Sequence, residues 1–281
     1  MLQYLNMEET LFCDRGVFEI DFIPEIFRFR ETQVSDIVSA IQPGPPGSSP
    51  RNLVLQGHPG TGKTTAVRRI FSEIRANGER FIPVYINCHA GRLKFDIFST
   101  IYTELHEQAP PRKAQTVHRL IEKIGKRVRE REEVLLVCFD NADALLPEYL
   151  LEIIICPILA YFNKHPKMRV FFILTMSMMT VDRRPALDPC IISVLRPEKV
   201  HFPLYKNKEV HEIIQDRVRA GLYPGVIPDE VFSFLISHIT KIGDLQEGIN
   251  LVKWSVMSAE RDGRSSVTME DIIIHLKHPR M

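Results

Sequence analysis

The segment GHPGTGKT, residues 57–64, constrains the fold of this chain more than any other feature. It matches the pattern G-x-x-x-x-G-K-[ST], whose glycines let the backbone wrap so that successive N–H groups point at phosphate oxygens. The apolar run 52–56 precedes it, and a helical pattern with Ala66, Val67 and Ile70 on one face follows it. A strand before the loop and a helix N-terminus after it are the context that phosphate binding requires. The segment therefore predicts a nucleotide-binding loop.

Each part of this loop has an expected task. Lys63 would reach the β- and γ-phosphates as a point charge, and Thr64 would offer a hydroxyl to Mg²⁺. A second magnesium ligand is expected from Asp140, which follows the apolar run 134–139, because such enzymes hold the metal with an acid after a neighbouring buried strand. ATP or ADP with Mg²⁺ are the expected cofactors. The predicted nucleotide-binding residues are Gly57, His58, Pro59, Gly60, Thr61, Gly62, Lys63, Thr64 and Thr65.

The residue after Asp140 bears on hydrolysis. In many ATPases with this loop a glutamate stands there and polarises the attacking water, whereas this chain has Asn141. An amide orients water but cannot accept its proton, and general-base catalysis is typically worth about 10²–10⁴-fold. The sequence therefore predicts slow hydrolysis, with Asn141 in a catalytic position, unless Asp143 or another acid substitutes.

The pattern of apolar runs predicts the fold class. Short, continuous apolar runs indicate strands buried on both faces of a parallel sheet, and helical patterns alternate with them. The predicted strands are 52–56, 81–86, 134–139, 169–175 and 199–203. An α/β nucleotide-binding domain is expected over residues 1–204. Residues 205–281 show helical patterns only and predict a small all-helical second domain.

Composition limits the partners and the compartment. The chain has 36 basic and 35 acidic residues and a net charge of +1, so DNA binding would need a local patch, for which the basic run 123–132 is one candidate. Five cysteines without a CxxC pair favour a reducing, cytoplasmic setting over a disulfide framework. The N-terminus lacks the order of a signal peptide, and no apolar run approaches the roughly 20 residues of a membrane span.

Several segments occur in an order that resembles the archaeal origin-recognition and helicase-loader initiators, of the AAA+ class. They are 22–33, the loop 57–64, 84–105, 139–145, 187–205 and 243–252, and the resemblance covers about residues 12–276. It implies an AAA+ domain with a five-stranded parallel sheet and a helical lid. It also implies binding to duplex origin DNA, contact with sister initiator subunits or the replicative helicase, and a place on the nucleoid. Residues 89–105 resemble the DNA-contacting helix of this family, and 28–33 the stretch beside the adenine.

The departures from the family pattern concern hydrolysis and sensing. The family's Asp-Glu pair is Asp140-Asn141 here, and its γ-phosphate-sensing asparagine falls near Met176, flanked by Thr175 and Ser177. A thioether cannot replace an amide donor. In the lid, the family's Gly-Asp-Ala-Arg is replaced by residues 243–246, so Gln246 stands where an arginine would make a charge-assisted phosphate contact.

Two further departures concern assembly and DNA. Cys190 stands near a position that is often basic in the family, which leaves Arg196 as a candidate arginine finger acting on a neighbouring subunit or as a turn residue with a solvated charge. Family members usually continue into a winged-helix domain. The chain ends at Met281, so we expect a short paralogue without that domain.

Three functions remain open on these grounds. The first is an ATP-binding initiator-like protein of DNA replication with slow hydrolysis. The second is a noncatalytic AAA+ partner that regulates sister initiators through protein contacts without reading DNA. The third is another AAA+ ATPase, such as a clamp loader or a signalling ATPase, which the segments 187–205 and 243–252 disfavour.

Overall fold

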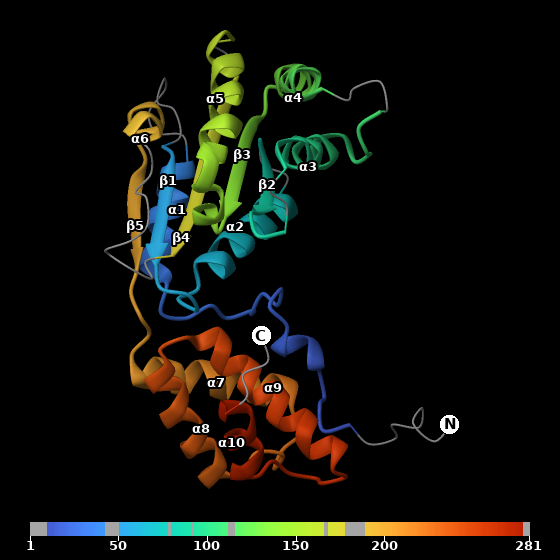
Figure 1. Ribbon diagram of the computed structural model, residues 1–281, viewed down its shortest axis with the longest axis vertical. Helices are drawn as coiled ribbons and strands as arrows, with labels where there is room; N and C mark the ends of the chain where they lie inside the picture. The colour runs from blue at the N-terminus through green and yellow to red at the C-terminus, as the bar shows by residue number, and fades with distance from the viewer. Residues whose placement is uncertain are drawn as a thin grey trace. The chain divides into compact units, whose positions relative to one another are not determined.

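The computed structural model describes two compact units (Figure 1). The described residues are 10–42, 51–77, 80–90, 93–111, 116–165, 168–177 and 189–277, without the side chains of Glu148 and Cys190. The first unit, here the sheet unit, comprises Arg30–Gly57 and Gly62–Phe202. The second, the helical unit, comprises the described residues up to Phe29, the loop residues His58–Thr61 and the chain from Pro203 onward.

A parallel sheet forms the centre of the sheet unit. Its strand order is β2-β3-β4-β1-β5, and each neighbouring pair is parallel. The five-stranded parallel sheet predicted from the sequence is thereby confirmed, and each predicted strand overlaps an observed one. The strands are β1 (Leu53–Gly57), β2 (Phe81–Asn87), β3 (Val134–Asp140), β4 (Arg169–Ser177) and β5 (Glu198–Phe202).

The two faces of this sheet are covered by different helices. Side chains alternate between faces along a strand. Val84, Val137 and Leu174 share one face and pack in a single core with α3 (Lys94–His106), α4 (Val117–Arg131) and α5 (Leu150–Asn163). None of the buried side chains of α1 (Glu31–Ile41) and α2 (Lys63–Asn77) belongs to that core. These two helices therefore cover the other face of the sheet. A short helix, α6 (Pro189–Leu195), precedes β5.

The helical unit has its own core, built by helices whose apolar side chains repeat on one face. Among the described residues, none of the helices in either unit is long and apolar enough to cross a lipid bilayer. The helices of this unit are α7 (Asn207–Gly221), α8 (Asp229–Ile242), α9 (Leu245–Arg261) and α10 (Met269–Lys277).

Residues 10–29 pack within the helical unit, although the sequence suggested that they belong to the first domain. Phe12 pairs with Leu222 in a short antiparallel bridge, and Phe18 packs so closely on α7 that a Cβ at Gly221 would collide with its ring. Phe12, Val17 and Phe18 are all buried in the core of the unit. The apolar burial of this segment therefore stabilises the helical unit rather than the sheet.

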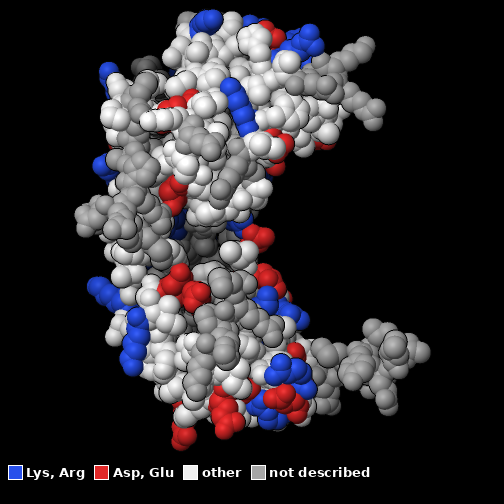
Figure 2. Space-filling view, in the orientation of Figure 1, with Lys and Arg blue, Asp and Glu red and all other residues white. Residues whose placement is uncertain are grey.

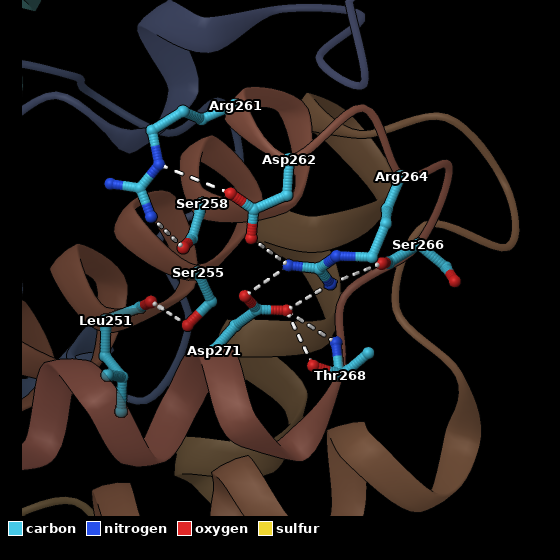
Figure 3. Close-up of polar contacts among 9 residues, drawn as sticks. All are labelled: Leu251, Ser255, Ser258, Arg261, Asp262, Arg264, Ser266, Thr268 and Asp271. Atoms are coloured by element: carbon cyan, nitrogen blue, oxygen red, sulfur yellow. Dashed lines mark hydrogen bonds and ion pairs between the residues drawn. The ribbon is translucent and has the colours of Figure 1, made fainter.

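A polar network fixes the start of α10 in the helical unit (Figure 3). Asp271, 1% exposed, accepts two hydrogen bonds from Arg264, both at 2.7 Å. It also accepts from the backbone N–H and the hydroxyl of Thr268, at 2.8 and 2.9 Å. Arg264 donates in addition to Asp262, at 2.9 Å. Thr268 and Asp271 thus cap the start of α10, and Arg264 adds an ion pair to this cap.

The charge of Asp271 should contribute to the stability of the helical unit. Burial alone would raise the pKa of Asp271, but the hydrogen bonds from Arg264 and Thr268 outweigh it and lower the pKa to about 2. A lowered pKa means that the contribution is present above about pH 4 and is lost as the pH falls toward 2. We expect Asp271→Asn to lower the free energy of unfolding by about 2 kcal/mol at pH 7, the value of hydrogen bonds to a charged group.

Urea unfolding followed by the fluorescence of Trp254, the single tryptophan and a residue of α9, measures this effect. Asp262→Asn is the matched control, because Asp262 bonds the same arginine from an exposed position. A smaller loss is expected for it. Equal stability of the Asp271 variant and the wild type at pH 7 would contradict the assignment.

Candidate nucleotide-binding site

The loop between β1 and α2 has the backbone of a phosphate-binding loop. Gly60 and Gly62 have φ values of 70° and 89°, in the left-handed region that glycine adopts without strain. Thr61 is buried, and its hydroxyl donates to the carbonyl of His58 at 2.7 Å. Lys63 is only 8% exposed, and its ammonium donates to the carbonyl of Gly57 at 2.8 Å. The lysine charge is thus held against the loop that the sequence predicted to bind phosphate.

The two residues predicted to hold Mg²⁺ lie in contact. Thr64 stands in the first turn of α2, and its hydroxyl is 3.0 Å from both carboxylate oxygens of Asp140, at the end of β3. Asp140 is 2% exposed. A hydroxyl and a carboxylate are oxygen ligands of the kind that Mg²⁺ takes in nucleotide sites. The donor set therefore fits the predicted metal.

Thr175 holds the same carboxylate from β4. Its hydroxyl is fully buried and donates to Asp140 Oδ1 at 2.6 Å. The same hydroxyl accepts the backbone N–H of Asn141 at 2.8 Å. Because a backbone N–H can only donate, the threonine proton must point at Asp140. Thr175 thus joins β4 to both residues of the Asp140–Asn141 pair.

Tyr85 of β2 completes the surroundings of Asp140, and sequence analysis missed it. Its hydroxyl donates to Asp140 Oδ2 at 2.6 Å and accepts from Arg68 Nη2 at 3.3 Å. The Arg68 guanidinium also lies over the tyrosine ring, 4.6 Å from its centroid. Burial, followed by the Asp140 charge, raises the pKa of Tyr85, so the phenol stays protonated. A tyrosine within a strand gives no sequence signal for this contact; only the strand order of the sheet places it beside β3.

The sheet also revises the position expected to sense the γ-phosphate. Met176 packs in the core formed with α3, α4 and α5, on the face away from Asp140. Its neighbour Ser177 lies on the Asp140 face, opposite Gly57 in the β1–β4 register. The Ser177 hydroxyl is buried and has no hydrogen-bond partner among the described residues. Of the residues near the expected sensor position, Ser177 therefore lies at the end of β4 on the Asp140 face, whereas Met176 lies on the opposite face.

Asn141 has a backbone that explains part of the choice of residue. Its φ and ψ are 57° and 48°, the left-handed conformation that asparagine tolerates better than most residues. Asp143, the next acid, stands in the 3-10 helix Ala142–Leu145.

Burial, followed by the charges of Asp140 and Asp143, raises the pKa of Cys88 to about 12, so this buried thiol stays neutral.

The remaining predicted residues lie in other local settings. Gln246 is in the first turn of α9, and its backbone N–H bonds the carboxylate of Asp244 at 2.9 Å. Within the helical unit, a Cβ at Gly60 would collide with Asp244, so the tip of the loop fits against the start of α9. Arg196 is exposed, with a φ of 44°, and lies between α6 and β5. The side chain of Cys190 lies outside the described residues.

Comparisons with known proteins agree with this arrangement. A family model for an AAA domain matches residues 47–178, and one for the Cdc6 AAA+ ATPase-type lid domain matches residues 211–273. ORC1-type DNA replication protein 2 of Methanosarcina mazei is 35% identical over 268 residues, which cover 95% of this chain and 71% of that protein. The chain belongs to the family of ORC1-type DNA replication proteins. The resemblance to initiators found in the sequence is thereby confirmed.

Solved structures of ORC proteins share the fold. The ORC1 protein of Aeropyrum pernix, solved in complex with DNA, superposes with a TM-score of 0.77 at 22% identity, over 97% of this chain and 71% of that one. The ORC2 protein of the same organism, solved as ADPNP-ADP complexes, gives 0.73 at 20% identity, over 96% and 72%. In this ORC1-type chain, the AAA+ sheet with a helical lid is therefore shown by sequence family and by fold.

The hydroxyl of Thr175 should be needed for the stability of the sheet unit. We expect Thr175→Val to lower the free energy of unfolding by about 2 kcal/mol, because it removes a buried donor to Asp140 and the acceptor of the Asn141 N–H. Thr175→Ser keeps both hydrogen bonds and should lose less. Urea unfolding followed by circular dichroism compares the two variants. If the valine variant were as stable as the serine variant, the two hydrogen bonds of the Thr175 hydroxyl would not contribute to stability as proposed.

Proposed function

We propose that this ORC1-type protein binds ATP or ADP with Mg²⁺, hydrolyses ATP slowly, and acts at duplex origin DNA in the initiation of replication. The contact of Thr64 with Asp140 carries the proposal. It places two oxygen ligands suited to Mg²⁺ beside the buried Lys63, whose ammonium is suited to bind phosphate. The nucleotide complexes named for the ORC2 protein of Aeropyrum pernix support the choice of ligand.

Slow hydrolysis rests on the residues around the expected γ-phosphate. Asn141 occupies the place of the base and cannot accept a proton. Ser177, a shorter group than the family's asparagine, is the buried polar side chain at the end of β4. Gln246 replaces a charged lid residue with a neutral one. We infer that bound ATP is kept rather than rapidly hydrolysed. We also infer that Arg196 is the candidate arginine finger that acts on a neighbouring subunit.

The role at DNA draws on the relatives. The ORC1 protein of Aeropyrum pernix was solved with DNA, and proteins named for DNA replication match nearly the whole chain. Sister initiators and the replicative helicase are the protein partners we propose, on the nucleoid. The match to the Cdc6 lid disfavours a clamp loader or a signalling ATPase.

One observation favours the alternative of a noncatalytic partner that regulates initiators without reading DNA. Two basic residues of α4 are paired with acids: Lys126 lies 3.8 Å from Glu130, and Arg127 lies 3.1 Å from Glu133. Basic and acidic side chains are also interspersed on the visible face of the helical unit (Figure 2). These acids oppose part of the charge that a surface tracking a phosphate backbone would need.

Nucleotide turnover tests the enzymatic part of the proposal. Purified protein is mixed with labelled ATP and Mg²⁺, and bound nucleotide and released phosphate are counted. We expect tight binding with little phosphate, loss of binding in Lys63→Ala, and turnover raised about tenfold or more in Asn141→Glu, which supplies a base. Asn141→Gln is the matched control, because it carries the same left-handed backbone strain without a carboxylate.

Two results would contradict this account. Ordinary turnover in the wild type, unchanged in Asn141→Glu and lost only in Lys63→Ala, would show that Asp143 or another acid serves as base. Absence of nucleotide binding would refute the proposal as a whole.

DNA binding separates the two roles. A gel shift with duplex origin DNA, with and without ATP, should show a complex that weakens steeply between about 50 mM and about 200 mM salt, because phosphate contacts release counterions. Failure to shift DNA at the lower salt, with nucleotide binding intact, would favour the protein-contact role.

A further inference from the structure

Arg68 stacks on Tyr85, and neither residue belongs to the phosphate-binding motif. The Tyr85 hydroxyl nevertheless donates to the carboxylate of Asp140, the proposed metal ligand. Arg68 follows Thr64 by one helical turn on α2, so both side chains lie on the face of the helix that meets the sheet. Tyr85 comes from β2, in register with Cys138 of β3 and on the same face as Asp140. Two separate elements, α2 and β2, therefore converge on Asp140 of β3.

The chemistry of the two donors fixes the direction of the tyrosine proton. A guanidinium donates hydrogen bonds and cannot accept them, so Arg68 must donate to the Tyr85 oxygen. The phenol proton is then directed at Asp140 Oδ2, 2.6 Å away, a length typical of a charge-assisted O–H···O⁻ bond. Successive hydrogen bonds of this kind polarise and strengthen one another.

The carboxylate of Asp140 is held in one orientation by the Arg68–Tyr85 pair and by Thr175. Thr175 donates to Oδ1, and Tyr85 donates to Oδ2, so rotation of the carboxylate would break one bond or the other. Thr64 approaches both oxygens at 3.0 Å, the longest of these contacts. A metal can therefore draw the Thr64 hydroxyl away while the carboxylate keeps its place.

We propose that Tyr85, oriented by Arg68, is a positioning residue that preorganises Asp140 for the metal of the nucleotide site. This inference rests on the proposed nucleotide binding and adds to it a residue pair outside the loop. Partners that orient a metal ligand commonly contribute about 10–100-fold to metal affinity. The pair should therefore govern metal binding and leave the affinity for metal-free nucleotide unchanged.

Binding of Mn²⁺ in place of Mg²⁺, counted by electron paramagnetic resonance in the presence of ADP, tests the inference. Tyr85→Phe keeps the ring and removes the hydroxyl, and we expect it to weaken Mn²⁺ binding roughly tenfold. Arg68→Met should act in the same direction and less strongly, because the phenol keeps its bond to Asp140 but loses its orientation. Affinity for ADP in the presence of EDTA should not change in either variant.

Arg69→Met is the matched control on the same helix, since Arg69 pairs with Glu73 at 3.1 Å. It should bind Mn²⁺ as the wild type does. Unchanged Mn²⁺ affinity in a folded Tyr85→Phe, or in Arg68→Met should the first variant fail to fold, would overturn the inference and leave the proposed function intact. An equal loss of metal-free ADP binding would also overturn it, by showing a merely structural role. A wild type that binds no ADP would overturn both.

Discussion

The proposed nucleotide site depends on the hydrogen bonds that hold the carboxylate of Asp140. It accepts hydrogen bonds from three hydroxyls, on Thr64, Tyr85 and Thr175, that come from α2, β2 and β4. Two of these hydroxyls are themselves held by donor-only groups, the Asn141 backbone N–H and the Arg68 guanidinium. An aspartate that is 2% exposed is tolerated because its lone pairs are satisfied in this way. The same bonds leave the weakest contact, that of Thr64, on the side where the phosphate-binding loop begins its helix.

The strand order of the sheet makes this convergence possible. β3 lies between β2 and β4, so Tyr85 and Thr175 flank Asp140 although they are far apart in the sequence. β4 lies beside β1, which brings Ser177 opposite Gly57 at the start of the loop. All strands point the same way, and the polar groups gather at their carboxyl ends, where open parallel sheets bind ligands. The helical unit, with residues 10–29, supplies a separate core.

Much of this could be predicted from the sequence, for reasons that are local. The run 134–139 is continuous and apolar because β3 is buried on both faces, and Asp140 follows it directly. The loop motif fixes Lys63 and Thr64 by spacing alone. Three features were beyond sequence reasoning. Tyr85 depends on which strand neighbours β3; Met176 and Ser177 differ by a single step of strand alternation; and residues 10–29 have no periodicity that shows which core they join. α5, apolar all round with Pro157 inside it, also gave no clear amphipathic signal.

The central claim is that a preorganised Asp140 and Thr64 hold the metal of a nucleotide that is kept rather than rapidly hydrolysed. The most direct measurement is a crystal structure of the protein with Mg²⁺ and ADPNP, the analogue named in the ORC2 complexes of Aeropyrum pernix. The account predicts the metal beside Thr64 and Asp140, the Tyr85 and Thr175 bonds to Asp140 retained, and the Ser177 hydroxyl directed toward the γ-phosphate. A metal bound elsewhere, or Asp140 rotated away from Tyr85 and Thr175 to reach it, would contradict the account.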